Sequence, residues 1–212
     1  MNFRKLIRVV DKEPVFPTGF LLAGEESRAE ISKQLTRWTN AGKIYQLRRG
    51  VYSLAPPYQK VAPHPFLVAN RLMPGSYVSL QSALSYFGLI PEIVPVTTSV
   101  TTRRQNRWEN PLGVYVFRYL QESYMFGYQH VEVAPGQMAF VAEAEKALLD
   151  LVYLTPGADS KEYLIELRLQ NTERLDLEKL TRYAEQMGKP KLLRVVSSLE
   201  AVTKDEEGYY TL

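Results

Sequence analysis

The segment from Ser27 to Leu54 constrains the fold of this chain most, because it places a helix start, a helix stop and a hairpin in close succession. Ser27 and Glu30 have the spacing of a capping box, in which each side chain bonds the backbone amide of the other residue at a helix N-terminus. Gly42 is a natural helix stop, because glycine adopts the left-handed conformation without strain. The segment therefore predicts a helix that begins at Ser27 and ends near Ala41.

This predicted helix has one apolar face and one basic face. Ile31, Leu35 and Trp38 recur at i, i+4 and i+7, which places them on one stripe. The polar and cationic residues on the other side are Arg28, Ser32, Lys33 and Arg37. The apolar stripe predicts contact with a core, and the opposite face is free to meet an anionic partner.

A basic hairpin follows the helix. Ile44–Leu47 and Val51–Leu54 have the composition of strands, and the turn between them contains Arg48 and Arg49 before a glycine. Together with Lys43, these cations make a basic helix and hairpin that outline a winged helix-turn-helix, a module that reads double-stranded DNA. The alternative is an ordinary α+β element whose basic face is simply solvated.

The distribution of charge favours the first interpretation. The chain has 212 residues and a formal net charge of +3. Residues 1–60 carry 11 Lys and Arg against 5 Asp and Glu, whereas residues 61–212 carry 15 against 18. Cationic charge is thus concentrated around the predicted helix and hairpin, as expected if that part neutralises phosphates.

The N-terminal segments and a proline-rich passage complete this unit. Phe3–Val10 predicts a short amphipathic helix that packs beneath the helix beginning at Ser27. Thr18–Gly24 is an apolar element that fits the middle helix of a three-helix module. Ala55–Pro65 contains four prolines, which cannot continue a helix or sheet. We therefore expect a winged helix-turn-helix domain over residues 1–58 and a larger α+β domain over residues 59–212.

The larger domain changes from helices to strands and back. Phe66–Met73 and Ser79–Gly88 predict helices. The next segments are rich in β-branched or alternating residues and predict strands: Val96–Thr102, Gly113–Leu120, Tyr124–Val133 and Gln137–Val141. Short loops between them favour a mostly antiparallel sheet. The chain then predicts the C-terminal helices Ala144–Tyr153, Ser160–Leu169, Leu177–Met187 and Lys191–Thr203, followed by a frayed acidic tail over Lys204–Glu207.

Several classes of function are disfavoured by the residues present. The chain has no cysteine and two histidines, His64 and His130, so we expect no metal site. It has no phosphate-binding loop, no nucleophile elbow and no dinucleotide fingerprint, so we expect no cofactor and no enzyme. The acidic residues Glu143, Glu145 and Asp150 are explained by a helix macrodipole or by ion pairs. Without a signal peptide or a membrane-spanning run, we expect a cytoplasmic protein.

A second basic patch lies between two predicted strands of the larger domain. Arg103, Arg104 and Arg107 stand beside Trp108. Arginines with an aromatic residue bind nucleic acid or an acidic partner protein, or they keep a loop soluble. We favour partner contact or solubility over nucleic acid for this patch.

Three segments together resemble one family. The run from Ser32 to Leu54, with Ala41-Gly42-Lys43-Ile44 and Arg48-Arg49-Gly50-Val51-Tyr52, is similar to the N-terminal winged helix of AbiE-type antitoxins. Tyr77–Leu84, with Phe87–Pro91, resembles the start of that family's second domain. Glu143–Leu151 resembles its Glu-Lys-Ala-Leu helix start, although Ala144 replaces the commoner proline. The matched segments span nearly the whole chain in the family's order.

The resemblance implies a DNA-binding repressor of its own operon. Its second domain would counteract a nucleotidyltransferase-like toxin encoded beside it, as in abortive-infection defence against phage. The resemblance leaves open whether antitoxin and toxin touch. The expected DNA contacts are Arg28, Ser32, Lys33 and Arg37 on the helix and Lys43, Arg48 and Arg49 on the wing. The alternative is a freestanding regulator or a protein-interaction module without a cognate toxin.

Overall fold

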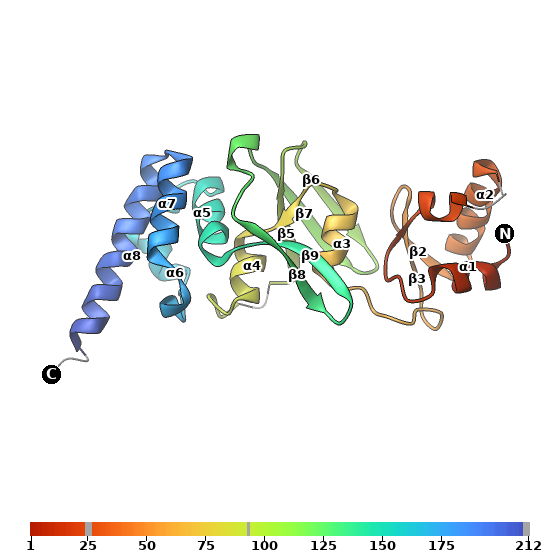
Figure 1. The fold of residues 1–212 in the computed structure, drawn as a ribbon, viewed down its shortest axis with the longest axis horizontal. Coiled ribbons are helices and arrows are strands. Elements are labelled where there is room, and N and C mark those ends of the chain that lie inside the picture. The colour runs from red at the N-terminus through yellow and green to blue at the C-terminus, as the bar shows by residue number, and fades with distance from the viewer. Residues whose placement is uncertain (24–26, 93, 210–212) are drawn as a thin grey trace.

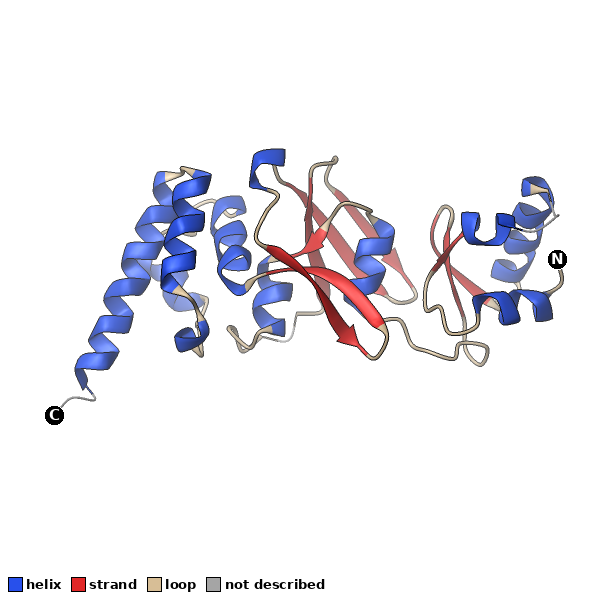
Figure 2. Ribbon diagram, viewed as in Figure 1, coloured by secondary structure: helices blue, strands red, loops and turns tan. Residues whose placement is uncertain are grey.

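The computed structural model describes residues 1–23, 27–92 and 94–209, and it is elongated (Figure 1). A small unit of helices and three strands lies at one end, a six-stranded sheet occupies the middle, and a group of helices forms the other end. Figure 2 shows that strands are confined to the first two parts. The chain is therefore α+β, with its C-terminal helices gathered together, as the sequence predicts.

The N-terminal unit contains the elements α1 (Phe3–Val10), β1 (Phe16–Pro17), the 3₁₀ helix η1 (Thr18–Ala23), α2 (Arg28–Asn40), β2 (Ile44–Arg48) and β3 (Val51–Leu54). The predicted capping box is confirmed: Glu30 N donates to Ser27 Oγ at 3.3 Å, and Ser27 N donates to Glu30 Oε2 at 3.1 Å. Gly42 follows the helix with φ +65°. The predicted apolar element over Thr18–Gly24 forms η1, and Gly24 itself lies outside the described residues.

The three strands form an antiparallel sheet in the order β1-β3-β2, and both faces of this sheet are covered. Tyr52 and Leu54 point into a core shared with α1 and α2, whereas Val51 and Leu47 belong to the main core of the chain. All four residues of β3 are therefore buried. Residues 55–64, where the domain junction is predicted, contain no helix or strand.

The central unit begins with α3 (Pro65–Leu72), β4 (Tyr77–Val78) and α4 (Leu80–Tyr86). The remaining strands are β5 (Val96–Thr101), β6 (Asn106–Asn110), β7 (Gly113–Tyr119), β8 (Tyr128–Ala134) and β9 (Gln137–Ala142), with the 3₁₀ helix η2 (Glu122–Tyr124) before β8. Their order in the sheet is β6-β7-β5-β4-β9-β8.

The sheet is mixed, so the prediction of a mostly antiparallel sheet is right only in part. β5 pairs with β7 in parallel, as does β4 with β9, while the other three neighbouring pairs are antiparallel. The short connection from β5 leads to β6, but β7 inserts between them. Arg107 and Trp108, expected in a connection, lie in β6. Tyr124, expected in a strand, lies in η2, and the strand begins at Tyr128.

The C-terminal elements are α5 (Ala144–Leu154), α6 (Lys161–Glu166), the 3₁₀ helix η3 (Thr172–Arg174), α7 (Leu177–Met187) and α8 (Pro190–Tyr209). Gly188 ends α7 with φ +61°, as predicted. The prediction of a frayed tail over Lys204–Glu207 is wrong, because these residues continue α8. Lysine and glutamate are good helix formers, and no residue in that stretch stops a helix.

A buried polar cluster joins α5 to the central sheet. Lys146 and Asp150 form an ion pair with no exposed side-chain surface. Asp150 Oδ2 also accepts hydrogen bonds from Tyr77 Oη at 3.0 Å and Ser79 Oγ at 2.8 Å, and Lys146 Nζ donates to Tyr77 Oη at 3.0 Å. Burial raises the pKa of Asp150 and lowers the pKa of Lys146, whereas each charge stabilises the other. Removing either charge alone would therefore leave the other one buried without its partner.

We predict that Lys146→Met destabilises the chain by roughly 3–5 kcal/mol, because it leaves the Asp150 carboxylate buried without a cation. Urea denaturation followed by circular dichroism measures the change. The double variant Lys146→Met, Asp150→Leu is the control, since it removes both charges. It should recover much of the loss, and a double variant less stable than the single one would contradict this explanation.

His64 should make stability depend on pH. Its Nδ1 accepts a hydrogen bond from Phe66 N at 3.2 Å and caps α3, which requires a neutral ring. Burial lowers the pKa of His64 below its ordinary value of 6.5. The folded chain therefore binds fewer protons at this site than the unfolded chain, and the stability that His64 contributes is lost as the pH falls through its folded pKa.

His64→Asn should reduce this dependence, because asparagine offers a capping oxygen that does not titrate. Thermal unfolding between pH 7 and pH 5 should show a smaller decrease in Tm for the variant than for the wild type. Equal decreases would assign the pH dependence to other groups.

Candidate nucleic-acid interface

Helix α2 lies on the side of the N-terminal unit that faces away from the central sheet (Figure 1). Ile31, Leu35 and Trp38 are buried in the core formed with α1 and β3. The capping box at Ser27 fixes where the helix begins, and the buried stripe fixes its rotation. The opposite face of α2 is therefore turned outward by local sequence and packing together.

The outward face carries the residues predicted from the sequence. Arg28, Ser32, Lys33 and Arg37 are all exposed. Within the described residues, no ion pair neutralises the three cations. The first turn contains one acid, Glu30, and its carboxylate is held by the capping box. The face therefore presents three uncompensated positive charges to solvent.

Lys43 extends this face toward α1. Its ammonium lies 4.9 Å from the centre of the Phe3 ring, and its backbone N donates to Trp38 O at 2.9 Å. Lys43 and Arg37 line a shallow recess of about 330 Å³ together with Asn2, the N-cap of α1. Two side chains and a positive helix end thus lie together, which suits an anion such as a backbone phosphate.

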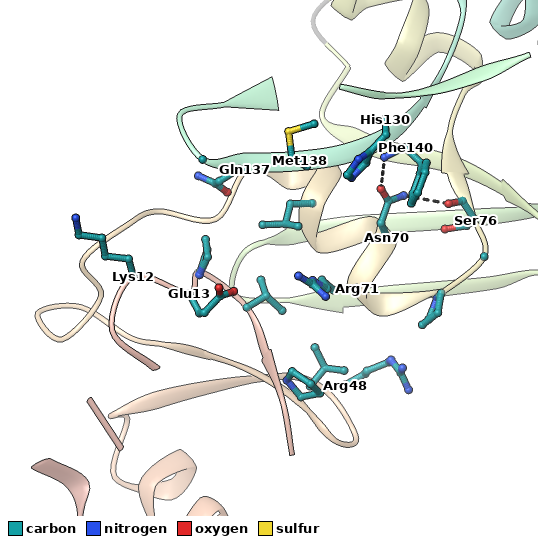
Figure 3. Close-up of a pocket in the computed structure, with 18 residues that line it drawn as sticks. Lys12, Glu13, Arg48, Asn70, Arg71, Ser76, His130, Gln137, Met138 and Phe140 are labelled. Atoms are coloured by element: carbon teal, nitrogen blue, oxygen red, sulfur yellow. Dashed lines mark hydrogen bonds between the residues drawn. The ribbon is translucent and has the colours of Figure 1, made fainter. Parts of the chain in front are cut away.

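The hairpin separates its two arginines. Arg49 is exposed at the turn, whereas Arg48 is half-buried and lines a cleft between the N-terminal unit and the central sheet (Figure 3). Arg48 Nε is buried and has no hydrogen-bond partner among the described residues. The strand pairing is irregular between Gln46 and Arg48, as in a β-bulge. Such an irregularity changes the direction in which the neighbouring side chains point. The structure therefore places Arg49, but not Arg48, on the exposed surface.

The second basic patch lies elsewhere. Arg103, Arg104 and Arg107 are exposed near the start of β6, whereas Asn110 at the end of β6 donates to Leu47 O in the hairpin at 3.4 Å. Arg107 lies 3.6 Å from the carboxylate of Glu109, and exposed pairs of this kind contribute little. The patch is thus separate from the cations of α2.

Trp108 packs partly against the protein core. Its ring packs edge-on against Phe117 at 5.1 Å between centroids, and it is partly buried against the main core. The aromatic residue beside the three arginines is therefore only partly exposed.

The acidic residues in and just before α5 form hydrogen bonds and ion pairs with neighbouring elements. Glu143 accepts hydrogen bonds from Tyr183 Oη and Gln129 Nε2, both at 2.7 Å. Glu145 accepts from the backbone N of Asp176 at 2.9 Å and lies 3.7 Å from Lys179. Asp150 belongs to the buried cluster with Lys146. These carboxylates already have partners within the chain, which accounts for them without a substrate.

Among the described residues, no group of three or more His, Cys, Asp or Glu side chains is placed to hold a metal ion. In the same part of the chain, no helix is long and apolar enough to cross a membrane.

Sequence reasoning missed the residues that line the central side of the cleft. Arg71 is the one charged residue of helix α3, while Met138 and Phe140 are large apolar residues exposed on β9. A single cation in a mostly apolar helix and a strand with apolar residues on both faces were the available signals. They became interpretable only when the fold brought the segments together.

No protein-family model and no curated protein matches the chain. The crystal structure of the RV2827C protein from Mycobacterium tuberculosis is similar, with a TM-score of 0.58 and 15% sequence identity. The match covers 92% of this chain and 73% of that chain. At this level of identity, the likeness shows that the two proteins share a fold.

Proposed function

We propose that this chain is a DNA-binding transcriptional autoregulator of the AbiE antitoxin type, and that residues 1–58 form a winged helix-turn-helix. The observation that carries the proposal is the outward face of α2, where Arg28, Lys33 and Arg37 are exposed and unpaired within the described residues. A face of this kind supplies the electrostatic attraction on which binding to duplex DNA depends.

The order of elements in the N-terminal unit supports the winged-helix assignment. A helix, a short strand, two further helical elements and a hairpin follow one another, and β1 pairs with β3. This order and pairing are typical of winged helices, in which the last helix before the hairpin enters the major groove. Here that helix is α2, and η1 takes the place of the middle helix.

The expected DNA contacts divide into three groups by their position on the interface. Arg28, Ser32 and Lys33 lie on the N-terminal half of α2, the part of a recognition helix that contacts base edges. Arg37 and Lys43 lie at its C-terminal end beside the start of α1, where phosphate contacts are expected. Arg49 on the hairpin turn is available to a phosphate or the minor groove.

The antitoxin half of the proposal rests on the motif resemblance of the central and C-terminal parts. The partner would be a nucleotidyltransferase-like toxin encoded beside this chain, counteracted with or without direct contact. A chain without such a neighbour would be a freestanding regulator, and its DNA-binding half would be unchanged.

We predict that the triple variant Arg28→Ala, Lys33→Ala, Arg37→Ala binds the chain's own promoter at least tenfold more weakly than the wild type does. The dependence of log K on log salt concentration should become shallower by about one unit for each phosphate contact that the variant loses, since each such contact releases about one counterion on binding. Gel-shift titrations at several salt concentrations measure both quantities.

The matched control removes three exposed arginines from β6 and its preceding loop, in the variant Arg103→Ala, Arg104→Ala, Arg107→Ala. It should keep both the affinity and the salt dependence of the wild type. A wild type that does not bind its promoter, or two triple variants that lose affinity equally, would refute the proposed interface.

A second prediction separates the two halves of the function. The full-length α2 triple variant should still rescue cells that express the neighbouring toxin, because its substitutions leave the central and C-terminal parts intact. Colony counts after co-expression from a constant promoter measure rescue. Loss of rescue in a variant that is folded and equally abundant would tie toxin neutralisation to the DNA-binding face.

A further inference from the structure

The cleft between the N-terminal unit and the central sheet has a volume of about 660 Å³ (Figure 3). One wall comes from the N-terminal unit and includes Pro14, Val15 and Arg48. The other wall comes from α3 and the β8–β9 hairpin. The volume is within the range of cavities that hold small molecules.

Two arginines contribute positive charge to this cleft, one from each side, and with Lys12 they outnumber Glu13, the one acid among the described residues that line it. Arg48 is half-buried, and its Nε has no hydrogen-bond partner among the described residues. Arg71 projects from the last turn of α3 and forms no ion pair with any described residue. The terminal nitrogens of the Arg48 guanidinium are not among the buried atoms, and with Arg71 they can donate charge-assisted hydrogen bonds to an anion in the cleft.

The β8–β9 side of the cleft is apolar and aromatic. Met138 and Phe140 have exposed fractions of 38% and 43%, although both are large hydrophobic residues. The His130 ring stacks on Phe140 with 4.6 Å between centroids. Figure 3 shows these three residues together on one wall. Their rings and thioether suit the flat apolar body of a ligand.

Hydrogen bonds from outside the hairpin hold this wall in place. Asn70 Oδ1 accepts from Phe140 N at 2.6 Å, and Asn70 Nδ2 donates to Ser76 O at 3.2 Å. Gln137, which is buried, accepts from His64 N at 2.7 Å and donates to Ala62 O at 3.0 Å. The hairpin is thus tied both to α3 and to the segment that joins the two units.

We propose that this cleft binds a small aromatic anion. Its carboxylate or phosphate would be held by Arg48 and Arg71, and its ring would lie against Phe140 and Met138. Because the ligand contacts both units, it stabilises one relative placement of the N-terminal unit and the central sheet, and so changes the affinity of α2 for DNA. This regulatory step rests on the proposed function, whereas the binding site does not.

Isothermal titration calorimetry on the full chain tests the site with defined probes. Phenyl phosphate and benzoate each carry a ring and an anion, inorganic phosphate carries only the anion, and benzyl alcohol carries only the ring. We expect saturable binding of phenyl phosphate or benzoate, at least tenfold tighter than that of either single-feature probe. Whichever of phenyl phosphate and benzoate binds more tightly shows whether the site prefers a phosphate or a carboxylate.

The variants assign binding to the cleft. Arg71→Ala and Phe140→Ala should each weaken binding of the better probe at least tenfold, while Arg103→Ala, an exposed arginine outside the cleft, should leave it unchanged. The site is overturned if neither aromatic anion binds, if inorganic phosphate binds equally well, or if Arg71→Ala and Arg103→Ala have equal effects.

Regulation is tested by gel-shift titration with and without the better probe. We expect the probe to change the affinity of the wild type for promoter DNA at least threefold and to leave that of Arg71→Ala unchanged. Binding in the calorimeter with no change in DNA affinity would overturn the regulatory step alone. A wild type that binds the probe but not the promoter would overturn the proposed function and leave the ligand site standing.

Discussion

The structure depends on a small sheet that is buried on both faces. In β3, Tyr52 and Leu54 pack against α1 and α2, while Val51 packs into the main core. Leu47 in β2 does the same, and its carbonyl oxygen accepts a hydrogen bond from Asn110 at the end of β6. Removing apolar surface from water is the dominant favourable term in folding. Here the two faces of one sheet bury apolar side chains in two different cores, one in each unit. The N-terminal unit is therefore packed onto the central sheet through its strands rather than joined to it only by a linker.

This packing determines how the basic residues can be used. The strands face the central sheet, so α2 is left on the opposite side with its cations exposed (Figure 1). Of the two hairpin arginines, Arg49 remains on the surface, while Arg48 lies at the junction between the units. The junction thus combines a packing contact with a charged cleft. Any molecule that binds there contacts the part that we propose reads DNA and the part that we propose serves the antitoxin role.

The motif around α5 has a structural explanation in this fold. Glu143 and Glu145 connect α5 to α7 and to the residues that precede it, and Lys146 and Asp150 connect α5 to Tyr77 and Ser79. Gly127 packs so closely that an added Cβ would lie 3.1 Å from Lys146 Cβ and 2.9 Å from the Tyr183 ring. These residues fix the C-terminal helices on the sheet. Any contact with a toxin would therefore use other surfaces of the central and C-terminal parts.

The sequence by itself determined the local features: the capping box of α2, its apolar stripe, its stop at Gly42 and the basic residues of its outer face. Such features depend on spacing within one or two turns, which can be read directly from the chain. Only the tertiary structure decided the mixed order of the central sheet, the burial of both faces of β3, and the meeting of Arg48 with Arg71 and Phe140 at one cleft. These pairings join residues far apart in sequence, and they follow from which apolar surfaces cover one another, a global property that no local pattern encodes.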